Sequence, residues 1–535
     1  MPNNKRSKKH KRKNHCDKNN DSTGNLADLS SNEDDINIMN EDFEKLKLQV
    51  DKPYQVKYSE IYGRYLVTSR DLKKGEILIE TDALVIGPCA ESLPICLGCY
   101  VDLVIVPRKY QCPDCGWILC QQNCPGIHTQ YGHTVWECQS FKEHKLASLL
   151  LKCDEKDIRF MYEAILTLRC LLLKQFNHEK WTKINEMESH NKLRRNMPSL
   201  WNRNQELIVD RIRHQWGYNQ YTEEEIHTIC GILEVNSFEV GSNGFRARAL
   251  FPEAYLICHD CQPNTTHTDD PLTHKLHLRS TVPLKKGETI TLSYSYTLQG
   301  TLKRRDHLHE SKFFWCTCNR CRDPTELGTH ASTLICPKCT NGFILSTDSL
   351  NQNAEWKCKK CNYKVSGKSI LILLDRLFDE LEVLDPNSIK DYEEYLKRYA
   401  NVLHQNHYLM LSVKHSLCQL IGRSDGFLIN ELNLSQLERK EQYCRDLLAV
   451  VDVFEPGMSR LRGIICYELH AAMMMRITRE FERKTINDNQ LRRTLREIVK
   501  LLQEANEILK IEPVGSSEYS MALAAQDALK KMGNI

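Results

Sequence analysis

The sequence predicts an α+β protein in which a β-rich domain is interrupted by a zinc-binding module and a helical segment, and is followed by a second zinc module and a helical C-terminal domain. Three observations predict this arrangement. Cysteines recur in closely spaced pairs, first between residues 96 and 138 and again between 316 and 361. Short β-prone segments lie on both sides of the first cysteine cluster. Apolar residues follow a helical period after residue 369.

The elements can be placed in order along the 535 residues. We expect a polar tail at 1–50, the first β-rich half at 51–90, a zinc finger at 91–140, a helical insert at 141–220, the second β-rich half with its own cysteines at 221–325, a zinc ribbon at 330–368 and a helical domain at 369–535. Several domains are expected at this length, since single domains usually have about 100–200 residues.

The tail is predicted to be disordered because it is polar and offers too little apolar surface to offset chain entropy. It begins with a basic cluster between Lys5 and Lys13 and continues into an acidic stretch around Glu33. The basic cluster is typical of a nuclear address or an RNA contact, and a solvated tail with neither role explains it equally well.

The composition favours thiols that bind metal. The chain has 24 cysteines, and its first residues contain no apolar segment of the kind that directs secretion. We therefore expect a reducing compartment, the cytoplasm and/or the nucleus, where disulfides are rare. We expect no membrane partner, because no apolar stretch is long enough to span a bilayer. The net charge of +3 gives no chain-wide electrostatic reason to expect nucleic-acid binding.

The first cysteine cluster has the spacing of two interleaved zinc sites. It reads Cys96-x2-Cys99, Cys112-x2-Cys115, Cys120-x3-Cys124 and His133-x4-Cys138. Cysteines two residues apart can bind one tetrahedral ion, and two such pairs close a structural site. We expect one site to consist of Cys96, Cys99, Cys120 and Cys124 and the other of Cys112, Cys115, His133 and Cys138, with His128 ranked second as the histidine ligand. A cluster of buried or disulfide-bonded cysteines is the alternative, and this density of pairs argues against it.

A second pair of pairs predicts a zinc ribbon. Its ligands are Cys336, Cys339, Cys358 and Cys361, two pairs that again have the x2 spacing. The helical region that follows would suit helix pairs stacked as in a tetratricopeptide array, although no clean repeat of that period is present.

Strands and helices are expected to alternate on both sides of the finger. The β-prone pieces Tyr65–Thr68 and Glu76–Glu80 precede the finger, and a helical stretch between Phe141 and Trp216 follows it. Strand and turn patterns return between Ile232 and Tyr296.

Several segments together resemble the SET and MYND domain family, and within it the arthropod SmydA-like branch. The cysteine-rich finger resembles a MYND finger, and it interrupts two β-rich segments that resemble the halves of a split SET domain. The matching segments are Gly63-Arg-Tyr-Leu-Val, Glu234-Val-Asn-Ser-Phe-Glu-Val, Cys258-His-Asp-Cys-Gln-Pro-Asn, Gly287-Glu-Thr-Ile-Thr-Leu-Ser-Tyr and Trp315-Cys-Thr-Cys-Asn-Arg-Cys. They extend from about residue 54 to residue 322, and the helical C-terminal part resembles the family only loosely.

The resemblance implies an S-adenosyl-L-methionine site beside a narrow channel for a lysine side chain. By analogy with the family, the cofactor-binding residues would be Gly63, Arg64, Asn236, Cys258, His259 and Phe314. Tyr294 would lie at the inner end of the channel and act as the catalytic residue, with Tyr296 as a possible assistant. Cys261, Cys316, Cys318 and Cys321 would bind a post-SET zinc ion, which brings the expected total to about four zinc ions.

Two positions depart from the family pattern. Tyr65 stands where the first cofactor motif usually has a second glycine, so a bulky side chain occupies a corner where the backbone would approach the ligand. Cys258 stands where the family usually has asparagine, and a thiol hydrogen-bonds more weakly than an amide.

These observations lead to two hypotheses about function. The first is a protein-lysine N-methyltransferase that acts on a histone or non-histone lysine, in chromatin and transcription regulation. The second, motivated by Tyr65 and Cys258, is a weakly active or inactive adaptor that binds corepressor peptides through its MYND finger. Direct nucleic-acid binding through the zinc modules is disfavoured, because Arg108 and Lys109 are the only basic residues between Cys96 and Cys138.

Overall fold

The computed structural model describes residues 52–533 except 91, 107, 151, 153, 242–246, 272 and 340. The tail at 1–50, for which disorder is predicted, lies outside the described residues. Among the helices that are described, none is both long and apolar enough to cross a membrane.

Strands from both sides of the inserted segments share sheets, as a split β-rich domain requires. An antiparallel hairpin joins β1 (Tyr54–Ser59) and β2 (Gly63–Thr68). A second sheet has the order β10-β11-β3, with β10 at Thr265–Asp269, β11 at Leu276–Ser280 and β3 at Ile77–Thr81. A third has the order β4-β8-β7, with β4 at Val85–Pro88, β8 at Ala247–Leu250 and β7 at Phe238–Val240. β3 and β4 therefore pair with strands that follow them by more than 150 residues, and the intervening chain is an insertion.

The insertion begins with the finger and continues as helices. The finger contains the short hairpin β5 (Tyr110–Gln111) and β6 (Ile118–Leu119) and ends in α2 (Val135–Glu143). The helical insert comprises α3 (Leu146–Leu150), α4 (Glu155–Phe176), α5 (His178–Asn185), α6 (Asn191–Arg194), α7 (Pro198–Asn204), and the π-helical turns η1 (Gln205–Val209) and η2 (Arg211–Gln215). α4 is almost completely buried from Tyr162 to Leu173 and packs on β4, so it forms the core of the insert.

The expected strand pattern from Ile232 is wrong at its beginning. α8 spans Glu223–Asn236 and therefore includes Ile232. A capping box of Thr222 and Glu225 starts this helix, and Ile226, Ile229 and Leu233 bury one face of it. The β-branched residues near the end of this segment favour a strand, but the helical spacing of its buried apolar residues decides for the helix.

The second β-rich half closes with a short parallel pair, β9 (Cys258–His259) and β12 (Thr291–Leu292), and with the 3-10 turn η3 (Ala254–Leu256). Helices α9 (Thr301–Lys312) and α10 (Asn319–Arg322) follow. The ribbon is a four-stranded antiparallel sheet of β13 (Leu334–Ile335), β14 (Phe343–Ser346), β15 (Trp356–Cys358) and β16 (Lys364–Val365).

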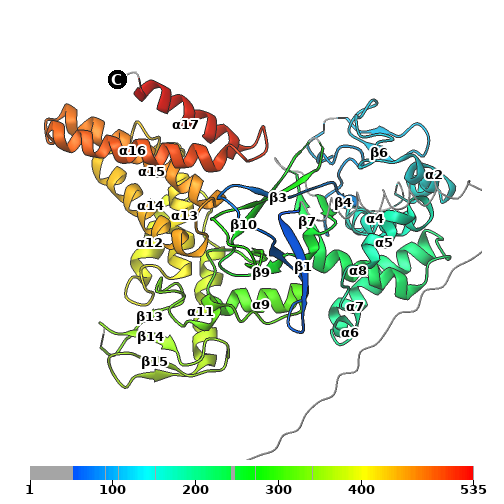
Figure 1. Cartoon of the computed structure of the whole chain (residues 1–535), viewed down its shortest axis with the longest axis horizontal. Coiled ribbons are helices and arrows are strands. Elements are labelled where there is room, and N and C mark those ends of the chain that lie inside the picture. The colour runs from blue at the N-terminus through cyan, green and yellow to red at the C-terminus, as the bar shows by residue number, and fades with distance from the viewer. Residues whose placement is uncertain are drawn as a thin grey trace, which may run out of the picture. The chain divides into compact units, whose positions relative to one another are not determined.

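The C-terminal region is helical, as predicted. Its helices are α11 (Gly367–Glu382), α12 (Ile389–Tyr399), α13 (Tyr408–Leu420), α14 (Leu434–Phe454), α15 (Arg460–Glu482), α16 (Asp488–Leu509) and α17 (Ser517–Gly533). From α13 onward, each helix packs against the next (Figure 1). Met473 is fully buried between them.

Candidate active site and zinc clusters

The predicted metal ligands gather into four clusters, in each of which all ligand atoms lie within 4.8 Å of one another. The clusters are Cys96, Cys99, Cys120 and Cys124; Cys112, Cys115, His133 and Cys138; Cys261, Cys316, Cys318 and Cys321; and Cys336, Cys339, Cys358 and Cys361. This grouping is the one expected from the spacing for the finger and the ribbon, and from the family resemblance for the third cluster.

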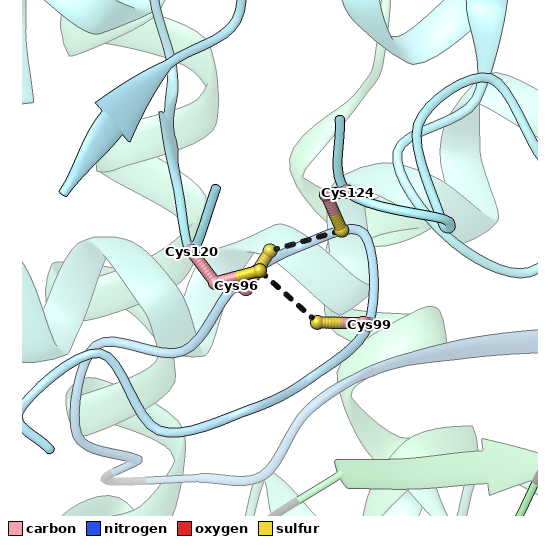
Figure 2. A group of neighbouring side chains, drawn as sticks. All are labelled: Cys96, Cys99, Cys120 and Cys124. Carbon is pink, nitrogen blue, oxygen red and sulfur yellow. Dashed lines mark hydrogen bonds between the residues drawn. The ribbon is translucent and has the colours of Figure 1, made fainter. Parts of the chain in front are cut away.

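The distances between sulfur atoms fit a tetrahedral zinc ion. A Zn–S bond of about 2.3 Å places two thiolates of one tetrahedron about 3.8 Å apart. The Sγ–Sγ distances are 3.7 Å for Cys96–Cys124, 3.5 Å for Cys99–Cys120, 3.6 Å for Cys112–Cys138, 3.9 Å for Cys261–Cys316 and 3.7 Å for both Cys336–Cys361 and Cys339–Cys358. Figure 2 shows the four thiols of the first cluster directed toward a common centre. These cysteines are free thiols, so each cluster can hold one zinc ion.

The structure brings His133 into the second cluster. Nε2 of His133 lies 3.2 Å from Sγ of Cys115, and its side chain is fully buried. His128 is partly exposed instead, and its Nε2 lies 3.5 Å from Oδ2 of Asp114. His128 also approaches Cys138, but Asp114, the other member of that group, is exposed.

Buried charges surround the third cluster. Nε of Arg304 lies 3.3 Å from Sγ of Cys261, so positive charge faces the sulfur atoms. Nη1 of Arg304 and Nε of Arg320 donate to the same carboxylate oxygen of Glu326, at 2.7 and 2.9 Å. Burial opposes ionisation of Glu326, but the two guanidinium groups outweigh it and lower the pKa of Glu326 to about 2.

The third cluster is joined to the crossing of β9 and β12 by one histidine. Nδ1 of His259 accepts a hydrogen bond from the backbone N–H of Tyr294 at 3.0 Å. Nε2 of the same ring lies 3.2 Å from Sγ of Cys261. Because Nδ1 accepts, the proton of the neutral ring is on Nε2 and faces the sulfur. His259 thus holds the backbone of Tyr294 in place relative to the third cluster.

A cavity of about 610 Å³ opens beside this crossing, within the range of small-molecule sites. Its lining comes from the end of α8, from β7, η3, β10 and β12, and from the end of α9. Of the residues predicted to form the site, Asn236, Tyr294 and Phe314 line it. Nδ2 of Asn236 donates to the carbonyls of Ile232 and Glu188, both at 2.9 Å, which holds the end of α8 against the insert.

The other predicted cofactor residues are not among those that line the cavity, and their roles stay predictions. Gly63 adopts a left-handed φ of 64° at the start of β2, which suits glycine. Arg64 donates to the carbonyl of Glu186 and lies 5.5 Å over the ring of Tyr255, a residue of the cavity wall. Cys258 is half-buried in β9, and burial raises the pKa of its thiol to about 11.

Two tyrosines occupy different depths of the cavity. Tyr294 packs against the core, and its hydroxyl donates to the carbonyl of Ile257. Burial, and secondarily the thiol of Cys258, raise the pKa of Tyr294, so it is a neutral hydrogen-bond donor at physiological pH. Tyr296 is 72% exposed, with its ring 6.3 Å from that of His307.

Sequence reasoning missed several residues of the wall, among them His190, Tyr255, His307 and Lys312. Lys312 is the least expected. Its Nζ donates to the carbonyls of Glu234 and Val235 at 3.0 and 2.9 Å and lies 6.0 Å from the centre of the Tyr294 ring. Burial lowers the pKa of Lys312. A lysine at the end of a polar helix ordinarily points to solvent, so no pattern in the sequence indicates this position.

The family model for the SET domain matches residues 63–295, from the start of β2 to just beyond β12, and this range includes the whole insertion. The "SET domain-containing protein SmydA-8, isoform B" of Drosophila melanogaster is 24% identical over 431 residues, 78% of this chain and 90% of its own length. A "SET and MYND domain-containing protein" of Dictyostelium discoideum is 24% identical over 58% of this chain and 95% of its own length. The chain therefore carries a SET domain and resembles SET and MYND domain proteins, the SmydA-8 protein among them.

Other proteins resemble this chain over shorter or more distant matches. The "N-lysine methyltransferase SMYD2" of Mus musculus is 30% identical over 157 residues, which are 27% of this chain and 33% of that protein. A solved chain described as "Crystal structure of the SET domain of LSMT bound to Lysine and AdoHcy" is 10% identical, with a TM-score of 0.25 over 79% of this chain and 89% of that chain. The finger at 91–140 is accordingly called the MYND finger below, and the third cluster the post-SET cluster.

Proposed function

We propose that this chain is an S-adenosyl-L-methionine-dependent protein-lysine N-methyltransferase. The observation that carries the proposal is the 610 Å³ cavity at the β9–β12 crossing, with Tyr294 at its buried side and Asn236 and Phe314 in its wall. The SMYD2 relative is named as an N-lysine methyltransferase, which supports the same activity. We propose further that its substrate is a histone or non-histone protein and that it acts in transcription regulation. Its expected location is the cytoplasm and/or the nucleus.

The residues present fit the cofactor. The cavity is large enough for a nucleoside with an amino-acid tail, and its wall offers an aromatic ring at Phe314 and polar groups at Asn236 and Ser293. These side chains would hold the cofactor. When bound, S-adenosyl-L-methionine supplies an electrophilic methyl group.

The chain's own residues prepare the lysine amine. Only a neutral amine has a lone pair for methyl transfer, and removal from water disfavours the ammonium form. Burial already lowers the pKa of Lys312 in the same cavity wall, so a substrate amine that enters is expected to lose its proton more readily. The neutral hydroxyl of Tyr294 would orient that amine: its proton goes to the carbonyl of Ile257, and its oxygen can accept a hydrogen bond from the amine. Orientation of the reactants contributes directly to the rate.

The experiment compares Tyr294→Phe with Tyr296→Phe in a labelled methyl-transfer assay on a protein extract stripped of existing methylation. Tyr294→Phe should lower the rate on the order of a hundredfold, the scale expected when a catalytic hydrogen bond is lost. Tyr296→Phe is the matched control, because its ring is 72% exposed at the cavity mouth. Equal rates for wild type and Tyr294→Phe, at equal zinc content, would remove Tyr294 from the catalytic role.

A second candidate is the adaptor that binds corepressor peptides. It is supported by two adjacent apolar side chains of the MYND finger, Val104 and Ile105, which are 63% and 72% exposed. Cys258 in the place of the usual asparagine supports it as well. Calorimetry separates the candidates, because an inactive adaptor should show no binding of S-adenosyl-L-methionine. The adaptor should also capture peptides, and the double variant Val104→Ser, Ile105→Ser should lose that capture.

A further inference from the structure

The zinc ribbon, defined here as residues 334–368, is strongly basic. Between 336 and 368 it carries six lysines and two carboxylates, a net charge of +4, whereas the whole chain has a net charge of only +3. The lysines are Lys338, Lys357, Lys359, Lys360, Lys364 and Lys368, and all six are exposed. The ribbon therefore carries a local excess of positive charge.

The fold of the ribbon gathers these lysines. In β15, Trp356 and Cys358 are buried, so Lys357 between them points to the outer face of the sheet. Lys364 of β16 is its cross-strand partner on that face. Lys359 and Lys360 lie between the ligands Cys358 and Cys361, and Lys338 lies between the other two ligands of the same cluster. The zinc cluster thus holds three lysines at one end of the sheet and the sheet presents two more.

These lysines are poorly neutralised. Lys364 pairs with Glu355 at 2.8 Å. For the other five, no carboxylate of the described residues forms an ion pair. Lys357 and Lys364 lie opposite each other, and Glu355 offsets only one of these two charges. A surface of this kind fits a polyanion.

Aromatic rings lie next to the lysines. Phe343 begins β14, is 38% exposed, and its carbonyl accepts a hydrogen bond from the backbone N–H of Lys359 at 3.0 Å. Gly342, the residue before Phe343, lies against Lys360: a Cβ added at Gly342 would be 3.3 Å from Cβ of Lys360. The rings of His330 and His404 lie 5.3 and 5.0 Å from that of Phe343. Burial lowers the pKa of both histidines, of His404 to about 4, so the cluster is uncharged at neutral pH and offers flat faces.

We propose that the zinc ribbon binds single-stranded nucleic acid, with its lysines on the phosphates and Phe343 stacked on a base. Lysines along the strand combined with aromatic stacking are the usual means of binding single strands. An acidic protein would match the charge but would make no use of a flat uncharged ring cluster beside it, so the ring cluster favours the nucleic acid. The sequence pattern disfavoured nucleic-acid binding by the zinc modules because only Arg108 and Lys109 are basic between Cys96 and Cys138, and the proposal departs from that expectation because the ribbon carries six exposed lysines.

The experiment measures binding of the full-length protein to fluorescein-labelled fifteen-base oligothymidine and oligouridine by fluorescence anisotropy, across a series of salt concentrations. The ribbon variant is Lys357→Gln, Lys359→Gln, Lys360→Gln. The matched control is Lys142→Gln, Lys145→Gln, Lys192→Gln, which removes the same charge from exposed positions of α2 and of the helical insert. Zinc content is measured for each variant, so that a misfolded ribbon is recognised.

The ribbon variant should bind at least tenfold more weakly than the control, and its log–log salt dependence should be less steep by about 2, since each lost phosphate contact removes about 0.7. Phe343→Ala should weaken binding of either oligonucleotide by about tenfold at unchanged salt dependence. An equal effect of the two lysine variants, or unchanged binding by the ribbon variant, would overturn the proposal and leave the contact to the basic tail or to net charge. Binding of labelled polyglutamate as tight as that of the oligonucleotides, insensitive to Phe343→Ala, would identify an acidic protein as the partner and overturn it as well.

Discussion

Glu137 lies between the zinc ligand His133 and the guanidinium group of Arg169. One oxygen of Glu137 is 2.8 Å from Nδ1 of His133, and its two oxygens accept hydrogen bonds from Arg169 at 2.7 and 2.9 Å. The other end of the arginine fork donates to the carbonyl of Ile86 in β4 and to the hydroxyl of Tyr100, both at 2.7 Å. A buried ion pair therefore connects a metal ligand of the MYND finger to the β-rich core and to α4.

Glu137→Gln should weaken zinc binding at the second cluster by about 10- to 100-fold, because the carboxylate that orients the histidine and raises its basicity is lost. It also leaves Arg169 buried without its counter-ion, which should lower the free energy of unfolding by about 3–5 kcal/mol. The measurement is competition for zinc by a chromophoric chelator. Glu143→Gln, at an exposed position of the same helix, is the control and should behave as wild type. Equal zinc release from the two variants would contradict this role of Glu137.

Cysteine spacing was sufficient to predict the partition of the finger and ribbon ligands. Two cysteines separated by two residues are constrained to one turn, so local sequence nearly determines which thiols meet. Tetrahedral closure requires two such pairs for each ion, and the fold of the finger brings the interleaved pairs together. The split β-rich domain was predictable for a different reason: its segments Gly63–Val67 and Gly287–Tyr294 have family-typical sequences on both sides of a zinc finger.

The cavity wall was less predictable, because its residues come from elements that are far apart in the sequence. Lys312 reaches the carbonyls that end α8, and His190 comes from the helical insert. Nothing local distinguishes either residue from a surface polar side chain. The same is true of the Glu137–Arg169 pair, whose members are 32 residues apart and meet only through the packing of α2 on α4.

The protein should contain four zinc ions per chain. Each of the four clusters has four ligand atoms at tetrahedral separations, which leaves no position for water and is typical of structural sites. Elemental analysis should return four ions for wild type and three for Cys339→Ser, which removes one ribbon ligand. Cys170→Ser, at a buried cysteine of α4 outside the clusters, should keep four. Two or fewer ions in untreated wild-type protein would disprove the assignment.

Glu326 should make stability depend on pH in the acidic range. Its folded-state pKa of about 2 lies below the ordinary value of 4.5, so its contribution is fully present above pH 4.5 and is lost as the pH falls toward 2. The shift corresponds to about 3 kcal/mol. Glu326→Gln should therefore be less stable than wild type by about this amount at neutral pH, and the difference should shrink as the pH is lowered.

Urea unfolding of both proteins between neutral pH and about pH 4 measures this difference directly, because protonation of the zinc-bound thiolates affects both alike. Glu310→Gln, at an exposed position of α9, is the control and should show no such trend. A difference between wild type and Glu326→Gln that stays constant with pH would mean that Glu326 does not titrate as described.

Lys312 should tune cofactor affinity by positioning the end of α8. Its ammonium group holds the carbonyls of Glu234 and Val235, and the next residue, Asn236, lines the cavity. Lys312→Met keeps most of the side chain's volume but removes both hydrogen bonds, which are worth about 1–2 kcal/mol together. The Kd for S-adenosylhomocysteine, measured by calorimetry, should therefore rise about tenfold. Lys312→Arg keeps a charged donor near the same carbonyls and should recover part of the affinity. If Lys312→Met binds the ligand as wild type does, the end of α8 is held by the hydrogen bonds of Asn236 alone, and Lys312 only fills the wall.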